Sequence, residues 1–422
     1  MNKLKFIFLF LLLFFLISLI IYYYYFFSPN KEKVLVINQV SYASLDSWTN
    51  DNHLKAFITF KISCKKLITL NPNKNMGAIT YVNNKEFPFA GTIKDWIKPC
   101  KEAIKTELYD NKEAMLYFQK WFLPFSISYS HFGNFFSKGD DLGLFTGYYE
   151  PVIEGSTIFT KDYIFPIYSY PNNYITIHLG EFKKSLEGTY ITGQIKNKKF
   201  IPTHKRSEID KGAISSNSKV LYWLKDDVEV FFLHIQGSGV IKLPNGTENR
   251  VSYDGSNGHD YFAIGRELIK KGYISKDEMS MQQIKLWLKN NPEKKDKILQ
   301  LNNRYIFFKK SLTNSATGAQ NTPLVGGRSL AVDLKWIPLG IPLWLDIDNY
   351  GNENKLIIKK LMISQDTGSA IKGIIRGDIF FGTGNKPGTL AGKMNQLGKY
   401  YALLPRELVL RRNLENINEE KN

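Results

Sequence analysis

Two neighbouring strings near the carboxyl end carry the densest chemistry of this chain: QDTGSAIKG at residues 365–373 and RGDIF at residues 376–380. In the second string, Asp378 stands between a glycine and an apolar pair. Burial at such a place raises the pKa of a carboxyl group, so that it can act as an acid near neutral pH. In the first string, Asp366 precedes Thr-Gly, which is typical of a turn. We therefore predict Asp378 as a general acid, against the alternative of a turn or bulge aspartate that only accepts backbone hydrogen bonds.

Four further strings lie upstream of these two. They are FTGYYEP at 145–151, LHIQGSG at 233–239, DGSNG at 254–258 with Tyr261 after it, and GGRSLAVD at 326–333. Each string alone is a weak signal. Together and in this order, the strings resemble the membrane-bound lytic murein transglycosylase A family, whose C-terminal module is marked by three aspartates. The resemblance covers roughly residues 145–404, and its most specific part is the carboxyl-terminal one.

The resemblance implies a mainly β fold with some α-helix. In this family, a double-psi β-barrel is assembled from the N-terminal segment and the three-aspartate module, and a second, smaller β domain is inserted between them. Composition shifts near Gly147 and Phe308 fit such an insertion. The expected parts are an anchor at 1–30, the first barrel part at 31–151, the insert with the substrate groove at 152–308, the second barrel part at 309–412, and a polar tail at 413–422.

The resemblance also implies a reaction. A lytic transglycosylase is a lyase that cleaves the β-1,4 bond between N-acetylmuramic acid and N-acetylglucosamine in peptidoglycan. It needs one acid/base and no cofactor, because the C6 hydroxyl of the substrate attacks and leaves a 1,6-anhydro ring. By position, Asp378 matches the catalytic aspartate of the family. Asp366 and Asp333 are the other two aspartates and are expected to support the site, Thr146 is expected to hydrogen-bond the acid, and Glu150 is a weaker candidate for the acid.

Sugar binding requires flat side chains and hydrogen-bonding groups. Arg328 is a candidate either for steering a lactyl or peptide carboxylate or for bracing the loop of Asp333. The other candidates for substrate binding are Tyr148, Tyr149, Gln236, Ser238, Asn257 and Tyr261.

Three other functions compete with this interpretation. The tetrapeptide DTGS at 366–369 matches the active site of aspartic proteases, but those enzymes need two such aspartates and this chain has one. A non-catalytic wall protein that binds peptidoglycan is the second alternative, because fold does not imply function. A hydrolytic glycosidase that uses water as its nucleophile is the third, and only the product separates it from a transglycosylase.

The first residues predict a membrane anchor. From Phe6 to Phe27 the chain has 22 residues without a charge, and a helix of that length is about 33 Å long, enough to cross the hydrocarbon core. The run ends in tyrosines and phenylalanines, which favours an uncleaved signal anchor over a cleaved signal peptide. We expect a body in the periplasm of a Gram-negative bacterium, held to the membrane by this helix.

The remaining composition limits the partners. The 422 residues have 43% hydrophobic residues and a net charge of +17, which is a globular composition of about two domains. The lysines form no basic run, so an anionic polymer or bilayer surface is a better partner than nucleic acid. The expected partners are peptidoglycan and other wall-remodelling proteins.

The histidines are scattered without metal-ligand spacing, so no metal is expected. Cys64 and Cys100 are either a disulfide formed in an oxidising compartment or two buried thiols.

Local patterns place a few elements. Asp110 followed by Glu113 predicts a helix start, and the segment 260–271 predicts a helix that stops at Gly272. Two short helices are expected around Pro292, with the proline in the first turn of the second. The alternation in YITIH at 174–178 predicts a strand.

Overall fold

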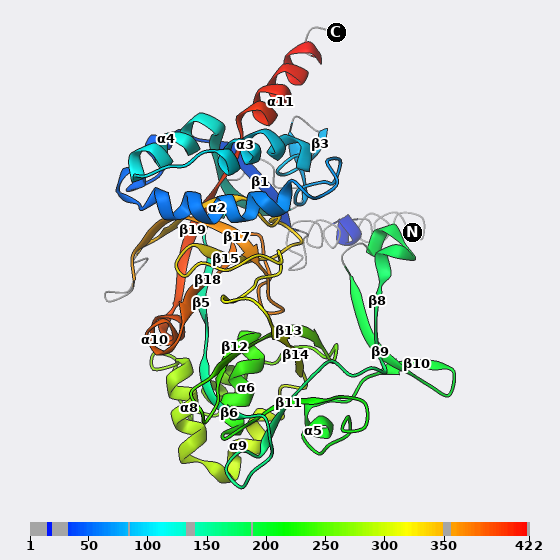
Figure 1. Ribbon diagram of the computed structural model, residues 1–422. Helices are drawn as coiled ribbons and strands as arrows, with labels where there is room; N and C mark the ends of the chain where they lie inside the picture. The colour runs from blue at the N-terminus through cyan, green and yellow to red at the C-terminus, as the bar shows by residue number, and fades with distance from the viewer. Residues whose placement is uncertain are drawn as a thin grey trace, which may run out of the picture.

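The computed structural model describes residues 15–18, 33–82, 85–131, 140–186, 189–348 and 356–419. Most of the predicted anchor at Phe6 to Phe27 lies outside these ranges. Within them, no helix combines the length and the apolar character needed to cross a membrane. The chain forms two bodies that lie one above the other in Figure 1, with strand β5 running from the upper body into the lower one.

The upper body is built on a ring of six strands. Their order is β19, β16, β17, β15, β18 and β5, and the ring closes because β5 also pairs with β19. The pairs β5 with β18 and β15 with β17 are parallel, and the other pairs of the ring are antiparallel. The bounds are β5 (Gly143–Glu150), β15 (Ser329–Val332), β16 (Pro342–Ile347), β17 (Ile358–Asp366), β18 (Arg376–Thr383) and β19 (Asn395–Pro405).

Burial on both faces explains why the sequences of these strands are continuously apolar and do not alternate between apolar and polar residues. Every residue of β15 and β16 is buried, because the inner face of the ring is the core and the outer face is covered. Phe145, Leu330 and Ile379 belong to this core. Strands β1 (Lys33–Gln39) and β4 (Phe122–His131) extend the sheet beyond β19, and β2 (Ile79–Val82) and β3 (Lys85–Pro88) form a separate hairpin.

Three helices pack on the upper body: α2 (His53–Leu67), α3 (Ile93–Lys105) and α4 (Asn111–Trp121). The predicted start of α4 is confirmed, since the Asp110 carboxylate accepts a hydrogen bond from the Glu113 amide at 2.8 Å. Cys64 in α2 and Cys100 in α3 form a disulfide. The segment 413–422, which the sequence presented as a tail, is instead helical up to Glu419. It continues α11 (Arg406–Glu419), whose first turns bury Leu408 and Val409.

The disulfide predicts a measurable loss of stability on its removal. A link that closes a loop of 36 residues stabilises a protein by roughly 3 to 4 kcal/mol in the chain-entropy model. We expect Cys64→Ser to lower the free energy of unfolding by that amount in urea titrations. Reducing agent should lower the stability of the unmodified protein equally and leave the variant unchanged; an equal effect of reductant on both would contradict the role of this disulfide.

The lower body contains a sheet of six strands and a layer of helices. The sheet has the order β14, β13, β12, β6, β11, β7, and Ile153, Val251 and Phe308 lie in its core. Its strands are β6 (Val152–Ser156), β7 (Phe165–Tyr168), β11 (Val220–Leu224), β12 (Ser238–Lys242), β13 (Glu248–Ser256) and β14 (Ile306–Ser311). The helices are α5 (Arg206–Ile209), α6 (Asp227–Gln236), α7 (Ile264–Lys270), α8 (Met281–Asn290) and α9 (Pro292–Leu299).

The local predictions for this body are largely confirmed. Pro292 opens α9 as expected, and the helix expected over 260–271 begins later, at Ile264. The predicted strand at 174–178 is β8 (Tyr174–His178), which forms an outlying sheet with β9 (Tyr190–Lys196) and β10 (Lys199–Pro202). Helix α10 (Asn385–Lys393) bridges the bodies, because the Gln282 amide of α8 donates to the Gly388 carbonyl at 2.9 Å. Short 3-10 turns complete the chain at Tyr42–Ser44, Trp48–Asn50, Leu179–Glu181 and Lys184–Leu186.

Candidate active site

Asp378 lies in β18 beside Thr146 of β5, its register partner in the parallel pair. The Thr146 hydroxyl donates to Asp378 Oδ1 at 2.5 Å, and Arg376 Nη2 donates to the Thr146 oxygen at 2.8 Å. An arginine has donors only, so the hydroxyl proton of Thr146 must point to the carboxylate. The three residues therefore form a chain of hydrogen bonds with a fixed direction, from Arg376 through Thr146 to Asp378.

Opposing influences act on the ionisation of Asp378. Burial raises the pKa of its carboxyl group, whereas the positive charge of Arg376 and the hydrogen bond from Thr146 lower that pKa. Burial is the largest influence, and the pKa is raised above the ordinary value of 3.8. The direction agrees with the expectation from its apolar neighbours in the sequence. A carboxyl group that is destabilised as an anion by burial, yet stabilised as an anion by one hydrogen bond and a nearby positive charge, can both give and take a proton.

Asp366 ends β17 and accepts three hydrogen bonds. The Tyr148 hydroxyl donates to Oδ2 at 2.7 Å, and the amides of Ala319 and Thr367 donate to Oδ1 at 2.8 and 2.9 Å. Burial and the charge of Asp378 raise the pKa of Asp366, although the three donors lower it. Its neighbour Tyr148 stays a phenol, because burial and the charge of Asp366 raise the tyrosine pKa well above 10. Asp366 thus fixes the loop at Ala319 and the ring of Tyr148 next to Asp378.

Asp333 stabilises a turn, and within the described residues its carboxylate shares no hydrogen-bond partner with Asp378. It follows β15, is 4% exposed, and accepts from the amides of Lys335 at 3.1 Å and Gly373 at 2.8 Å. The Gly373 amide belongs to the loop between β17 and β18. Asp333 therefore shapes the connection that leads into the strand of Asp378.

The lower body contributes one residue, Tyr261, that the charge of Asp378 reaches. The negative charge of Asp378 acts on the half-buried Tyr261 and, after burial, helps to raise the pKa of that phenol. Gln236, at the end of α6, accepts a hydrogen bond from the Tyr149 amide at 3.0 Å and is half-buried. Ser238 is half-buried and opens β12. Tyr261 of the lower body thus lies within reach of the charge of Asp378 in the upper body, whereas Gln236 and Ser238 lie where β5 enters the lower body.

Three of the predicted substrate contacts have buried side chains that bond or pack within the protein. Asn257 is 1% exposed, and its amide group bonds the backbone of His204, Asn303 and Tyr305 at 2.8 to 2.9 Å. Tyr149 is 7% exposed, and its ring lies against Gly388 of α10, where an added Cβ would lie 2.7 Å away from it.

Arg328 is the third of these. Its side chain is 4% exposed and forms two hydrogen bonds of 2.7 Å with the Asp51 carboxylate. It therefore neither steers a substrate carboxylate nor bonds Asp333.

Glu150 is excluded as the acid by a similar ion pair. Its side chain is fully buried, and Arg250 donates to both carboxylate oxygens at 2.8 and 2.9 Å. Thr383 donates a further hydrogen bond to the same carboxylate at 2.7 Å. These donors occupy both carboxylate oxygens of Glu150 at the junction of the two bodies.

Sequence reasoning missed Arg376 as a site residue, although the spacing contained a signal. Arg376 and Asp378 are two positions apart in one strand, so both side chains lie on the same face. Thr146 Oγ1 meets both of them from the neighbouring strand. Over the described ranges, no three His, Cys, Asp or Glu side chains gather in a way that could hold a metal ion.

Comparison with family models gives two matches. Residues 144–309 match the "MltA specific insert domain", and residues 328–404 match the "3D domain". A curated relative, the membrane-bound lytic murein transglycosylase A of Escherichia coli, is 33% identical over 264 residues, which are 61% of this chain and 65% of that protein. The match therefore spans less than two thirds of the length of this relative.

Solved structures are similar over more of the chain. A membrane-bound lytic murein transglycosylase from Agrobacterium tumefaciens has a TM-score of 0.76 at 28% identity and covers 89% of this chain and 99% of its own. MltA from Neisseria gonorrhoeae has a TM-score of 0.69 at 31% identity and covers 90% of this chain and 96% of its own. Escherichia coli MltA with bound chitohexaose has a TM-score of 0.52 at 30% identity and covers 66% and 76%. The mainly β architecture with some helix is thus shared with these proteins.

Proposed function

Because the chain belongs to the membrane-bound lytic murein transglycosylase A family, we propose that it is a lytic transglycosylase that cleaves the glycan strands of peptidoglycan. The observation that carries the proposal is the directed hydrogen-bond chain from Arg376 through Thr146 to Asp378. It supplies one carboxyl group that suits both halves of the reaction. The six-stranded ring is then the double-psi barrel, and the lower body is the insert at about residues 152–308.

In the first half of the reaction Asp378 is the acid. Its raised pKa favours the protonated form, which donates the proton to the glycosidic oxygen as the bond from C1 of N-acetylmuramic acid to that oxygen breaks. The N-acetylglucosamine that leaves keeps this proton as a hydroxyl group. Asp378 is then a carboxylate, which Thr146 and, through it, Arg376 stabilise.

In the second half Asp378 is the base. The C6 hydroxyl of the same muramic acid attacks C1, a C1–O6 bond forms, and the hydroxyl proton returns to Asp378. The 1,6-anhydro product contains no added water, and the enzyme ends in its starting protonation state. Intramolecular attack benefits from the high effective molarity of a held nucleophile, so one carboxyl group is sufficient.

The substrate groove lies between the barrel and the insert. Escherichia coli MltA has been solved with chitohexaose, a glycan chain, and the same class of ligand is proposed for this protein. Tyr261, whose pKa is raised by burial and the Asp378 charge, is the insert residue proposed to contact the sugar nearest the scissile bond. Tyr148, Gln236 and Ser238 remain proposed contacts, and Asp366 and Asp333 remain supporting residues.

The proposed location is the periplasmic face of a membrane. The relatives are named as membrane-bound, and the disulfide between Cys64 and Cys100 suits an oxidising compartment. Anchoring by the apolar residues before position 30 is part of this proposal.

The function is tested by mass spectrometry of sugars released from purified peptidoglycan by the full chain in detergent. Fragments ending in 1,6-anhydro-N-acetylmuramic acid would support the transglycosylase. Reducing ends would show that water is the nucleophile, and no release with retained wall binding would favour the non-catalytic wall protein.

Thr146 gives a prediction about pH. Thr146→Val removes the hydrogen bond that lowers the pKa of Asp378, so that pKa should rise further and the acid form should persist to higher pH. We expect the limb of the rate profile that reports this pKa to move toward higher pH. We also expect the acid step, which forms the carboxylate that Thr146 stabilises, to slow about tenfold or more, the size of a lost hydrogen bond to a charged group. Thr176→Val, in the outlying sheet, is the matched control and should change neither; an unmoved limb in Thr146→Val would remove Thr146 from the role proposed for it.

A further inference from the structure

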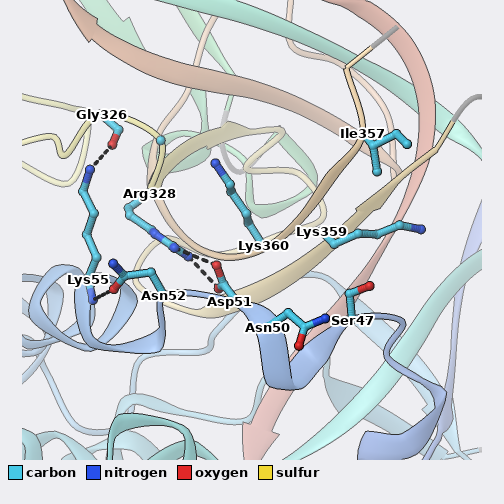
Figure 2. Close-up of a pocket in the computed structure, with 11 residues that line it drawn as sticks. Ser47, Asn50, Asp51, Asn52, Lys55, Gly326, Arg328, Ile357, Lys359 and Lys360 are labelled. Carbon is cyan, nitrogen blue, oxygen red and sulfur yellow. Dashed lines mark hydrogen bonds and ion pairs between the residues drawn. The ribbon is translucent and has the colours of Figure 1, made fainter. Parts of the chain in front are cut away.

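A cavity that Asp378 does not line lies at the start of α2. It has a volume of about 540 Å³, and three segments contribute its lining: Ser47, residues 50–52 and Lys55; residues 326–328; and Ile357, Lys359 and Lys360 at the start of β17. Figure 2 shows basic side chains entering it from all three segments. Its lining contains three lysines and one arginine but a single carboxylate, Asp51.

Two of the four basic groups are already neutralised. Arg328 is bound to both oxygens of Asp51, and the Leu361 amide adds a third hydrogen bond to this carboxylate at 2.9 Å. The Lys359 ammonium forms ion pairs with Asp46, Asp346 and Asp348. Neither group has charge left to attract a ligand strongly.

Lys55 and Lys360 are not neutralised in this way. The Lys55 ammonium donates to the carbonyl of Gly326 at 2.9 Å, and no carboxylate of the described ranges pairs with it. Lys360 has neither an ion pair nor a side-chain hydrogen bond within the described part of the chain, and in Figure 2 it points away from Lys359. Burial, then the positive charge of Arg328 and, to a smaller degree, that of Lys55 lower the pKa of Lys360, whereas the negative charge of Asp51 raises it. The cavity therefore has two cationic groups in excess.

The cavity is close to the candidate active site through one loop. The Gly327 amide donates to the carbonyl of Phe380 at 2.7 Å, and Phe380 is two residues after Asp378 in β18. Two residues of a strand span about 7 Å. Lys55 binds the other glycine of this loop, Gly326, so the loop forms a wall of the cavity and also contacts the catalytic strand.

We propose that this cavity binds a carboxylate of the peptide stems carried by the peptidoglycan strand, with Lys55 and Lys360 as the charged contacts. The inference rests on the proposed function, since it concerns the same substrate. The sugars of the strand are neutral where the lactyl group is joined to a stem, so the stem carboxylates are the anionic groups that two lysines can recognise. Ser47, Asn50 and Asn52 line the same cavity and supply neutral hydrogen-bonding groups. Lys55 and Lys360 would thus bind the substrate carboxylate for which the sequence suggested Arg328.

The test measures binding by the full chain carrying Asp378→Asn, so that ligands are not cleaved. The probes are a stem-bearing glycan fragment and chitohexaose, which has no stem. Removing both charges with Lys55→Gln and Lys360→Gln should weaken binding of the stem-bearing fragment about five- to tenfold, the sum of two partly exposed charge pairs. Binding of chitohexaose should stay within about twofold of its starting value. The matched control is Lys211→Gln with Lys289→Gln, which removes two exposed charges elsewhere and should change neither affinity.

The outcomes are separable. Equal affinity for the stem-bearing fragment with and without the cavity lysines would overturn the proposal while leaving the transglycosylase intact. Equal weakening for both probes would also overturn it, because the lysines would then act on the glycan. Failure of the unmodified chain to release anhydro sugars would instead count against the proposed function, whatever the lysines do.

Discussion

Replacing Asp378 by asparagine is expected to lower the release of anhydro sugars from peptidoglycan by at least about a thousandfold. General acid–base catalysis contributes roughly 10²–10⁴-fold, and here one residue performs both proton transfers. Asparagine keeps the size of the side chain and the acceptor for the Thr146 hydroxyl but cannot donate or accept the proton. The rate is measured by mass spectrometry of the released fragments.

Two controls show whether the loss of activity comes from the missing carboxyl group itself. The variant should remain folded and should still bind chitohexaose, because the carboxyl group is proposed to act in the transition state. Asp162→Asn changes an exposed aspartate in a loop and should leave the rate as it is. Normal turnover by Asp378→Asn would exclude Asp378 as the acid and direct attention to Asp366, the other carboxyl group next to Tyr148.

The second large effect is on stability and concerns Asp51. Asp51→Asn leaves the buried guanidinium of Arg328 without its counter-charge, and breaking a buried pair in this way costs about 3 to 5 kcal/mol. The free energy of unfolding from urea titration should fall by that amount. Glu407→Gln is the matched control, because its ion pair with Lys98 is more than 60% exposed on both sides, and such pairs contribute about 0 to 1 kcal/mol. Equal losses in the two variants would contradict the importance of burial at Arg328.

Local features were predictable from the sequence because they depend on near neighbours. The helix after Asp110 begins where a side chain caps an amide three positions on, and Pro292 opens a helix because its missing amide proton is not needed there. The raised pKa of Asp378 has burial as its largest cause, as expected for a carboxyl group in an apolar strand.

Long-range pairings explain what the sequence did not reveal. Arg328 looked available, but its partner Asp51 is 277 residues away in the chain. Asn257 has the chemistry of a sugar contact, yet it joins two backbone segments of the lower body, one at His204 and one at Asn303 and Tyr305. The role of Arg376 depends on the pairing of β5 with β18, which places Thr146 beside it. The spacing of residues within one strand does not predict which other strand pairs with it.

The closure of the ring by β5 affects how the molecule is made. Thr146 and Asp378 are separated by 232 residues, so the contact between them has a very high contact order. The insert lies wholly between them and has its own core, so it can fold while the carboxyl-terminal strands are still being synthesised. An unfinished chain contains neither Asp378 nor the strands that close the ring. The catalytic site of the proposed transglycosylase therefore cannot form until synthesis of the chain is nearly complete.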